Sequence, residues 1–180
     1  MRFLYAALIV ILLASCAQKT DMPEFPVRPA PSITGVDQNG QSFNSSVLHD
    51  KPWLASFFFT TCESVCPALN AVQKQLVTEF GGRVGFVSIS TDPETDTGAT
   101  LAAYAKQYDA KPGSWWMVTM PESEMREIAT DGFSLMDPKE PAMHSTRFVA
   151  IDADGMIKGY FDSSDSAGIE KLRTWIHSQL

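Results

Sequence analysis

Apolar runs alternate with amphipathic segments along most of this chain. Residues 53–59 are apolar at nearly every position, which is typical of a strand buried on both faces. Apolar residues then recur at helical spacing between Leu69 and Phe80. Pro67 stands where a first helical turn accommodates proline. This part of the sequence therefore predicts a buried strand followed by a helix.

The remaining pattern continues the alternation and ends on a hairpin and a helix. Asn39-Gly40 and Asp154-Gly155 each separate two strand-like runs, which is a strong hairpin signal. The further predicted elements are strands at residues 33–36, 41–43, 84–90, 115–119, 147–152 and 156–162, and helices at 101–108, 121–130 and 167–179. This order predicts an α/β fold: a thioredoxin-like mixed sheet with helices on both faces and an added amino-terminal β-hairpin.

The amino-terminal end is typical of an exported protein. Arg2 precedes an apolar run at residues 3–14, which is shorter than the roughly 20 residues of a membrane span. The sequence Leu-Ala-Ser-Cys that ends at Cys16 resembles the lipobox of bacterial lipoproteins. The resemblance implies cleavage before Cys16 and lipid attachment to it. The alternative is an ordinary signal peptide with an incidental cysteine.

Three segments follow from this interpretation. We expect a signal peptide at residues 1–15, a lipidated Cys16 with a proline-rich tether over 16–32, and a single domain at 33–180. The protein is then expected in the bacterial cell envelope, held by a lipid anchor. Its domain would face the periplasm or the outside of the cytoplasmic membrane.

Composition narrows the partners. Hydrophobic residues make up 44% of the chain and aromatic residues 11%, enough for a full core, and the formal net charge is −7. An acidic protein of this kind is a poor candidate for nucleic-acid binding, which rewards a basic surface. We expect a monomer that binds no nucleic acid and meets the membrane through its lipid.

The main candidate chemistry lies in a cysteine pair. If Cys16 carries lipid, Cys62 and Cys66 are the two remaining cysteines, at the end of the buried strand and the start of the helix. A helix amino terminus stabilises negative charge, so we expect a lowered pKa for Cys66. The pair is suited to redox chemistry or to a soft metal ion. The alternative, an inert structural disulfide, closes so small a loop that it would add little stability.

A histidine far downstream is the candidate third ligand. His144 comes just before the strand predicted at residues 147–152, and in thioredoxin-like folds the loop entering that strand faces the cysteines. Two thiolates and one imidazole suit copper(I) better than zinc, which usually takes a fourth ligand. Copper(II) would need a further donor. Met143 is a conceivable one, although methionine more often serves packing.

An acidic segment follows the second buried strand. Residues 90–97 read Ser-Thr-Asp-Pro-Glu-Thr-Asp-Thr, and the simplest interpretation is a turn in which Asp96 or Thr97 caps the next helix. Strand ends on this edge of the sheet point toward the mouth that contains Cys62. Asp92 is therefore a candidate for a position beside the ligands or for contact with a partner.

Three motifs in this order resemble the Sco/SenC family of copper-binding proteins. They are residues 59–67 (Phe-Thr-Thr-Cys-Glu-Ser-Val-Cys-Pro), the segment 90–97 given above, and residues 144–155 (His-Ser-Thr-Arg-Phe-Val-Ala-Ile-Asp-Ala-Asp-Gly). The resemblance spans residue 33 to the carboxyl terminus and implies a thioredoxin-like fold. It places the copper ligands at Cys62, Cys66 and His144 and the motif aspartate at Asp92.

The same resemblance implies a role in building the dinuclear copper centre of cytochrome c oxidase. Members of the family deliver copper to the receiving subunit or reduce its cysteines. Some bacterial relatives are linked instead to redox signalling or oxidative stress. A lipid anchor in place of the family's usual transmembrane helix departs from the pattern.

Three other classes of protein remain as alternatives. A thiol–disulfide oxidoreductase without metal is the main one, although its usual motif has two residues between the cysteines rather than three. A thiol peroxidase would need threonine where Phe59 stands, three positions before Cys62. A structural lipoprotein domain would bind no metal and would tolerate loss of Cys62.

Overall fold

One twisted sheet forms the centre of the molecule. The computed structural model describes residues 27–136 and 145–180. The strands are β1 (Arg28–Pro29), β2 (Thr34–Asp37), β3 (Ser42–Asn44), β4 (Trp53–Phe58), β5 (Gly85–Ser90), β6 (Trp115–Thr119), β7 (Arg147–Ile151) and β8 (Met156–Asp162). Their order is β1-β8-β7-β4-β5-β6-β2-β3, with β4, β5 and β6 parallel and every other pair antiparallel.

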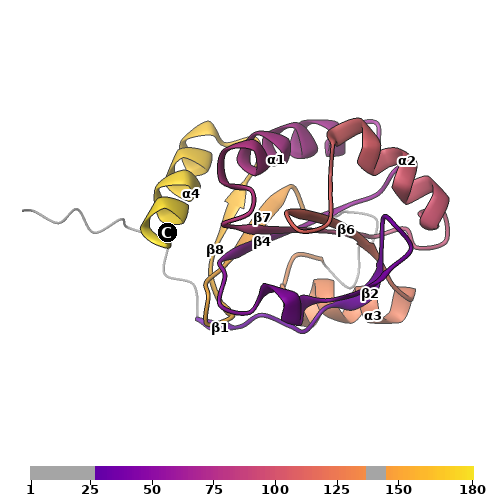
Figure 1. The fold of residues 1–180 in the computed structure, drawn as a ribbon, viewed down its shortest axis with the longest axis horizontal. Coiled ribbons are helices and arrows are strands. Elements are labelled where there is room, and N and C mark those ends of the chain that lie inside the picture. Colours follow the sequence, from indigo (N-terminus) through magenta and orange to yellow (C-terminus); the bar gives the residue numbers. More distant parts are fainter. Residues whose placement is uncertain (1–26, 137–144) are drawn as a thin grey trace, which may run out of the picture.

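Helices cover both faces of this sheet, as the sequence predicts. They are α1 (Cys66–Phe80), α2 (Gly98–Tyr108), α3 (Glu122–Glu127) and α4 (Ser166–Ser178). In Figure 1, α1, α2 and α4 lie above the sheet and α3 lies below it. The strands β4, β5 and β6 are neighbours in that order, so the crossovers β4–α1–β5 and β5–α2–β6 advance in the same direction. Because such connections are right-handed, both helices lie on the same face of the sheet. The predicted thioredoxin-like mixed sheet is confirmed.

Two hydrophobic cores result, one on each face. The core under α1, α2 and α4 contains Phe58, Phe86 and Trp115 from the strands, and both described cysteines belong to it. The opposite core contains Phe57 and Phe133 and packs the amino-terminal segment and α3 against the sheet. All six residues of β4 are buried, which confirms the two-sided burial predicted from its apolar run.

Both predicted hairpins form through aspartate-supported turns. Gly40 and Gly155 have positive φ angles of 73° and 77°, a conformation that glycine adopts without strain. Asp37 Oδ1 accepts hydrogen bonds from the backbone of Asn39 and Gln41. Asp152 performs the same role before Gly155, where it accepts from two backbone amides. The added amino-terminal hairpin, β2–β3, is thereby confirmed.

A short edge strand extends the sheet within a segment predicted to be tether. Arg28 and Pro29 pair with Ile157 and Met156 of β8. The Arg28 guanidinium donates to Asp131 O at 3.2 Å, to Ser134 Oγ at 2.8 Å and to Tyr160 Oη at 3.2 Å. Sequence reasoning missed this strand because the segment around it is rich in proline. Contacts with distant side chains, rather than local strand propensity, hold it in place.

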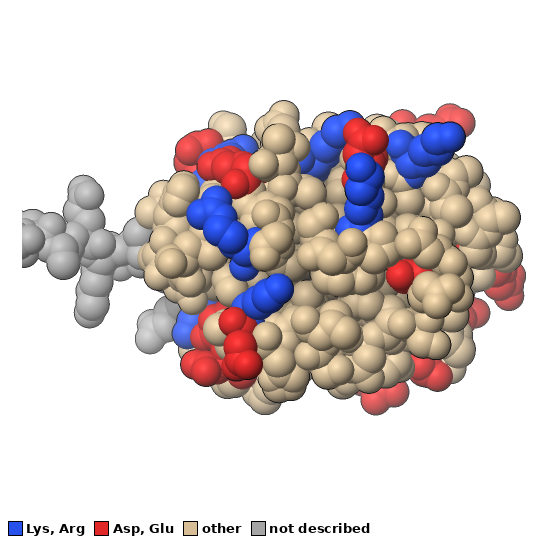
Figure 2. Space-filling view, in the orientation of Figure 1, with Lys and Arg blue, Asp and Glu red and all other residues tan. Residues whose placement is uncertain are grey.

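The surface in Figure 2 carries interspersed charges. Basic and acidic side chains lie side by side along the top and the left of this face, acidic ones alone appear along its lower right rim, and much of its centre carries neither. Glu79 of α1 forms an ion pair with Arg173 of α4, which joins the two helices. No helix within the described residues has the length and apolar character needed to cross a membrane.

Candidate metal and thiol site

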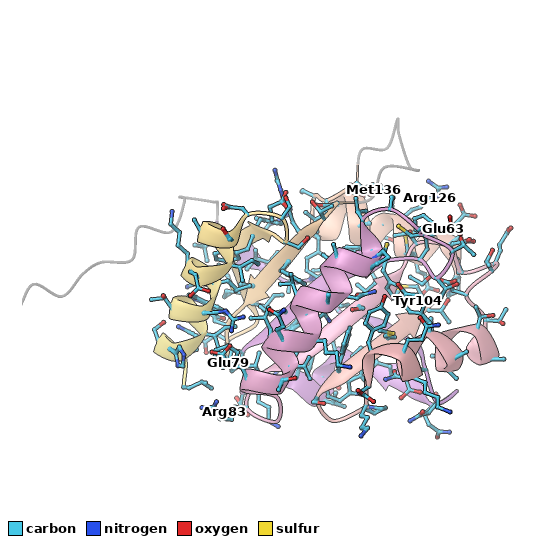
Figure 3. The ribbon with its side chains drawn as sticks, turned by 90° about the horizontal axis from the view of Figure 1, so that it is seen from above. Glu63, Glu79, Arg83, Tyr104, Arg126 and Met136 are labelled. Carbon is cyan, nitrogen blue, oxygen red and sulfur yellow. The ribbon has the colours of Figure 1, made fainter. Side chains whose placement is uncertain are left out.

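The cysteine pair lies where β4 passes into α1. β4 ends at Phe58, and α1 begins at Cys66 with a proline in its first turn. Cys66 is therefore the first helical residue, whereas Val65 occupies the cap position without a side-chain capping bond. Cys62 is 6% exposed and Cys66 is fully buried. Figure 3 labels Glu63, the residue after Cys62, near the amino-terminal end of α1.

Local hydrogen bonds hold both thiols in place. The backbone N–H of Cys66 donates to Cys62 Sγ at 3.4 Å, and the backbone N–H of Cys62 donates to Phe59 O at 3.2 Å. The hydroxyl of Ser64 lies 3.7 Å from Cys62 Sγ. Cys62 and Cys66 are not joined by a disulfide bond in this structure. The loop thus presents two adjacent sulfur atoms, one at the surface boundary and one beneath it.

The structure corrects the expectation that Cys66 is acidified. Burial, as the largest cause, raises the pKa of Cys66 to about 12, and a side-chain hydrogen bond with Cys62 adds to the increase. A backbone hydrogen bond with Phe59 acts in the opposite direction, while the charges of Cys62 and Asp96 raise the pKa further. The helix-terminal amide of Cys66 points at the sulfur of Cys62 instead. The first amide of the helix therefore bonds to Cys62 and does not stabilise a thiolate at Cys66.

Aromatic side chains form the floor beneath the pair. Tyr104 stacks on Phe58 with ring centroids 5.4 Å apart. Asn70, one helical turn after Cys66, donates to Tyr104 Oη at 2.9 Å. Burial raises the pKa of Tyr104 above its ordinary value, so its hydroxyl stays protonated. This floor excludes water from the inner side of Cys66 and accounts for the cost of ionising it.

The predicted third ligand, His144, lies outside the described residues, as does Cys16. The described part of the chain contains no group of three or more histidine, cysteine, aspartate or glutamate side chains able to hold a metal ion. β7 runs antiparallel to β4 and begins at Arg147, so the first residue of β7 lies beside the last residues of β4. Ser145 and Thr146 therefore enter the sheet from the edge at which the cysteine loop leaves it.

The donor set that is described fits a soft cation. Two sulfur atoms from one loop, adjacent and largely shielded from water, favour copper(I) over hard cations. Copper would be cargo here, and each thiol would lose its proton on binding. The raised pKa of Cys66 makes the loss of its proton unfavourable until the metal ion binds.

Asp92 lies in the turn that the sequence predicts, whereas Asp96 does not have the expected role of a helix cap. Asp92 is partly exposed and shapes a turn: its carboxylate accepts from Thr95 N at 3.3 Å. Asp96 does not cap α2, whose cap position is Thr97 without a side-chain bond. It is fully buried and accepts from Thr60 and Ser90. Sequence reasoning missed this contact because a capping aspartate and a buried one have the same local pattern.

A separate cavity lies at the far end of the sheet. Its volume is about 280 Å³, and its lining includes Trp53 at the start of β4 and Asp152–Gly155 after β7. Neither cysteine lines it. Since β4 runs from this end to the cysteine loop, the cavity is a full strand length from the sulfur atoms and is not part of their site.

Fold and site together define a thioredoxin-like domain with a buried thiol pair at the first turn of a helix. The family model for SCO1/SenC matches residues 27–177. The SCO1 protein homolog of Bacillus subtilis (strain 168) is 31% identical over 165 residues, which cover 86% of this chain and 83% of that protein. The chain belongs to the SCO1/SenC family.

Solved structures agree with this assignment. BsSco, a member of the Sco family of cytochrome c oxidase assembly proteins in which a disulfide switch was identified, aligns with a TM-score of 0.72 and 25% identity. The alignment covers 84% of this chain and 92% of BsSco. Copper-bound ScoI of Bradyrhizobium japonicum aligns with a TM-score of 0.68 and 23% identity, covering 85% of this chain and all of that one. At that identity the second match shows the shared fold.

Proposed function

We propose that this chain is a lipid-anchored copper chaperone of the bacterial cell envelope. It binds copper through Cys62, Cys66 and His144 and supports assembly of the dinuclear copper centre of cytochrome c oxidase. The observation that carries the proposal is the pair of adjacent cysteine side chains at the start of α1. The copper held by ScoI and the oxidase-assembly family of BsSco support it.

The arrangement of the two thiols supports capture in sequence. Cys62 lies at the surface boundary and receives the helix amide, so it is the sulfur that meets an incoming ion first. Cys66 then completes a two-sulfur grip and gives up its proton. His144 supplies the third donor from the segment that precedes β7. Release to a receiving subunit proceeds by exchange of these soft ligands at the same edge of the sheet.

A second candidate function rests on the same hydrogen bond. A cysteine that receives a helix amide and lies nearer the surface than its fully buried partner also suits disulfide exchange. In that case the protein would reduce the cysteines of the receiving subunit and need no metal. The two functions share the thiols and differ in whether copper passes through them.

The test is oxidase activity in cells grown with scarce copper. A strain that lacks this protein is complemented with wild type, Cys62→Ser, Cys66→Ser or Val65→Ser. Val65 is an exposed residue of the same loop, so its replacement by serine is the matched control. We expect activity from wild type and Val65→Ser alone, and recovery of the deletion strain by added copper. Recovery by a membrane-permeant thiol reductant but not by copper would favour the reductase instead, and full activity without the protein would refute both.

A further inference from the structure

A fully buried carboxylate ties the cysteine loop to the neighbouring strand. Asp96 is 0% exposed. Its oxygens accept from Thr60 Oγ1 at 2.5 Å and from Ser90 Oγ at 2.5 Å, and the backbone N–H of Thr60 lies 3.2 and 3.1 Å from Oδ1 and Oδ2. Burying a carboxylate is unfavourable unless donors surround it. These donors meet that requirement, so the contact is a built one rather than an incidental one.

The contact reaches both cysteines through the neighbouring residue, Phe59. Thr60 follows Phe59, whose carbonyl accepts the backbone N–H of Cys62 at 3.2 Å. A backbone hydrogen bond also joins Phe59 to the thiol of Cys66. Fixing the Phe59–Thr60 unit therefore fixes the partner of each cysteine. Asp96 acts on this unit from the far side, through Thr60, and has no need to touch a sulfur itself.

We propose that Asp96 is a positioning residue that holds Cys62 and Cys66 together for copper capture and for disulfide formation. The copper half of this statement rests on the proposed function, whereas the disulfide half rests on the thiol pair alone. A loop held in its binding geometry loses less conformational freedom when its ends are joined. Without the contact, the two sulfurs come together less often, so both the copper complex and the disulfide are less favoured.

Asp92 provides a matched comparison from the same turn. Its backbone N–H donates to Ser90 Oγ, and the hydrogen bond found for its carboxylate within the described residues comes from Thr95, inside the turn. Removing that carboxylate leaves the bonds between Asp96 and Thr60 in place. An effect of Asp96 that Asp92 does not share is therefore an effect of the tie.

The first measurement is the equilibrium of the thiol pair with glutathione, which requires no copper. The two protein thiols form one disulfide and give two electrons and two protons to glutathione disulfide, which becomes two glutathione thiols. We expect about a tenfold smaller equilibrium constant for Asp96→Ala and for Thr60→Val, which corresponds to a potential about 30 mV less negative. The equilibrium constant of Asp92→Ala should remain within twofold of wild type. Thr60→Ser keeps the hydroxyl, so its equilibrium constant should lie much closer to wild type than that of Thr60→Val.

Two further variants separate position from charge and from misfolding. Asp96→Asn keeps the shape of the side chain, an oxygen that accepts from Thr60 and a group able to bond Ser90. Its equilibrium constant should therefore stay within threefold of wild type. The double variant Asp96→Ala/Thr60→Val should be no worse than either single one, because both remove the same contact. If Asp96→Ala does not fold, Thr60→Val and its serine counterpart carry the test. Equilibrium constants within twofold of wild type for folded Asp96→Ala or Thr60→Val would overturn the proposal, as would equal losses in Asp96→Asn and Asp96→Ala.

Copper(I) affinity is the second measurement. We expect about a tenfold loss in Asp96→Ala and no more than a twofold loss in Asp92→Ala, the scale seen when a group that orients a metal ligand is removed. If wild type binds no copper, the proposed function fails while the glutathione result still decides the role of Asp96. If wild type binds copper and Asp96→Ala binds it equally well, the positioning role in copper capture is refuted.

Discussion

The backbone amide of Cys66 donates to the sulfur of Cys62 at 3.4 Å. The first amide of α1 thereby serves the earlier cysteine, while Cys66 itself is sealed against the aromatic floor of the core. The pair is asymmetric: one sulfur is poised for contact and the other is kept protonated by burial. Both candidate functions use this division, because copper capture and disulfide exchange each begin at the sulfur that lies nearer the surface, that of Cys62.

The buried thiol gives a pH dependence of known sign. Folding raises the pKa of Cys66 from 9.0 to about 12, so between these values the unfolded chain loses a proton that the folded chain retains. The free energy of unfolding of the reduced protein should therefore fall as pH rises from about 9 to about 12, and this contribution is constant below pH 9. Urea unfolding across this range should show a shallower decline in Cys66→Ala. Identical slopes would contradict the raised pKa.

Metal binding and disulfide formation should exclude each other. The same two sulfur atoms, of Cys62 and Cys66, cannot bond to each other and also donate to copper. Protein oxidised until it has no titratable thiols should bind little copper, and a reductant should restore binding. Thiol titration and metal analysis on the same samples check this. Full loading of the oxidised protein would be incompatible with a site made from these sulfurs.

Asp92→Ala should separate binding from transfer. The carboxylate supports its own turn and is not a soft ligand, so the fold and copper(I) affinity should stay within about twofold of wild type. Transfer to the copper-receiving oxidase domain should slow, because this turn lies at the edge of the sheet where the cysteine loop also lies. Stopped-flow transfer rates are the measurement. Equal rates would reduce Asp92 to a turn residue.

The anchor can be tested apart from the site. If Cys16 carries the proposed lipid, Cys16→Ser should release a soluble protein that still binds copper, because Cys62 and Cys66 belong to the core of the domain that follows. Cells should lose delivery more than binding, since a tethered chaperone meets a membrane-bound oxidase at high effective concentration. Fractionation and oxidase activity in scarce copper give the readout. Retention of Cys16→Ser in the membrane fraction would show that the lipobox interpretation is wrong.

Periodicity was sufficient to predict most of this fold. The buried run at residues 53–59 and the helical spacing after Pro67 placed β4 and α1 correctly, because both elements follow from local patterns. β1 was missed, since its pairing with β8 depends on the contacts of Arg28 far along the chain. Local sequence predicts an element well where its own run of apolar residues marks it, as in the six buried positions of β4, and the two residues of β1 carry no such pattern.

The site shows the same limit. The motif located both cysteines, but the prediction that the helix end acidifies Cys66 was wrong, because the helix amide is directed at the sulfur of Cys62. The motif did not reveal which sulfur receives that amide, because burial of Cys66 comes from tertiary packing under α2. Nor did it distinguish Asp96 from a helix cap, since the bond to Thr60 joins residues 36 positions apart. Such long-range contacts decide pKa and positioning.

The most direct test of the central claim is copper(I) binding by the reduced domain, residues 27–180, in competition with a copper(I) chelator. We predict one copper(I) per chain, near-complete loss of binding in Cys62→Ser and Cys66→Ser, and a partial loss in His144→Ala that leaves copper on two thiolates. His177→Ala is the control, because that side chain packs on Phe80 and lies near Glu79, away from the cysteines. Unchanged affinity in Cys66→Ser would contradict the account.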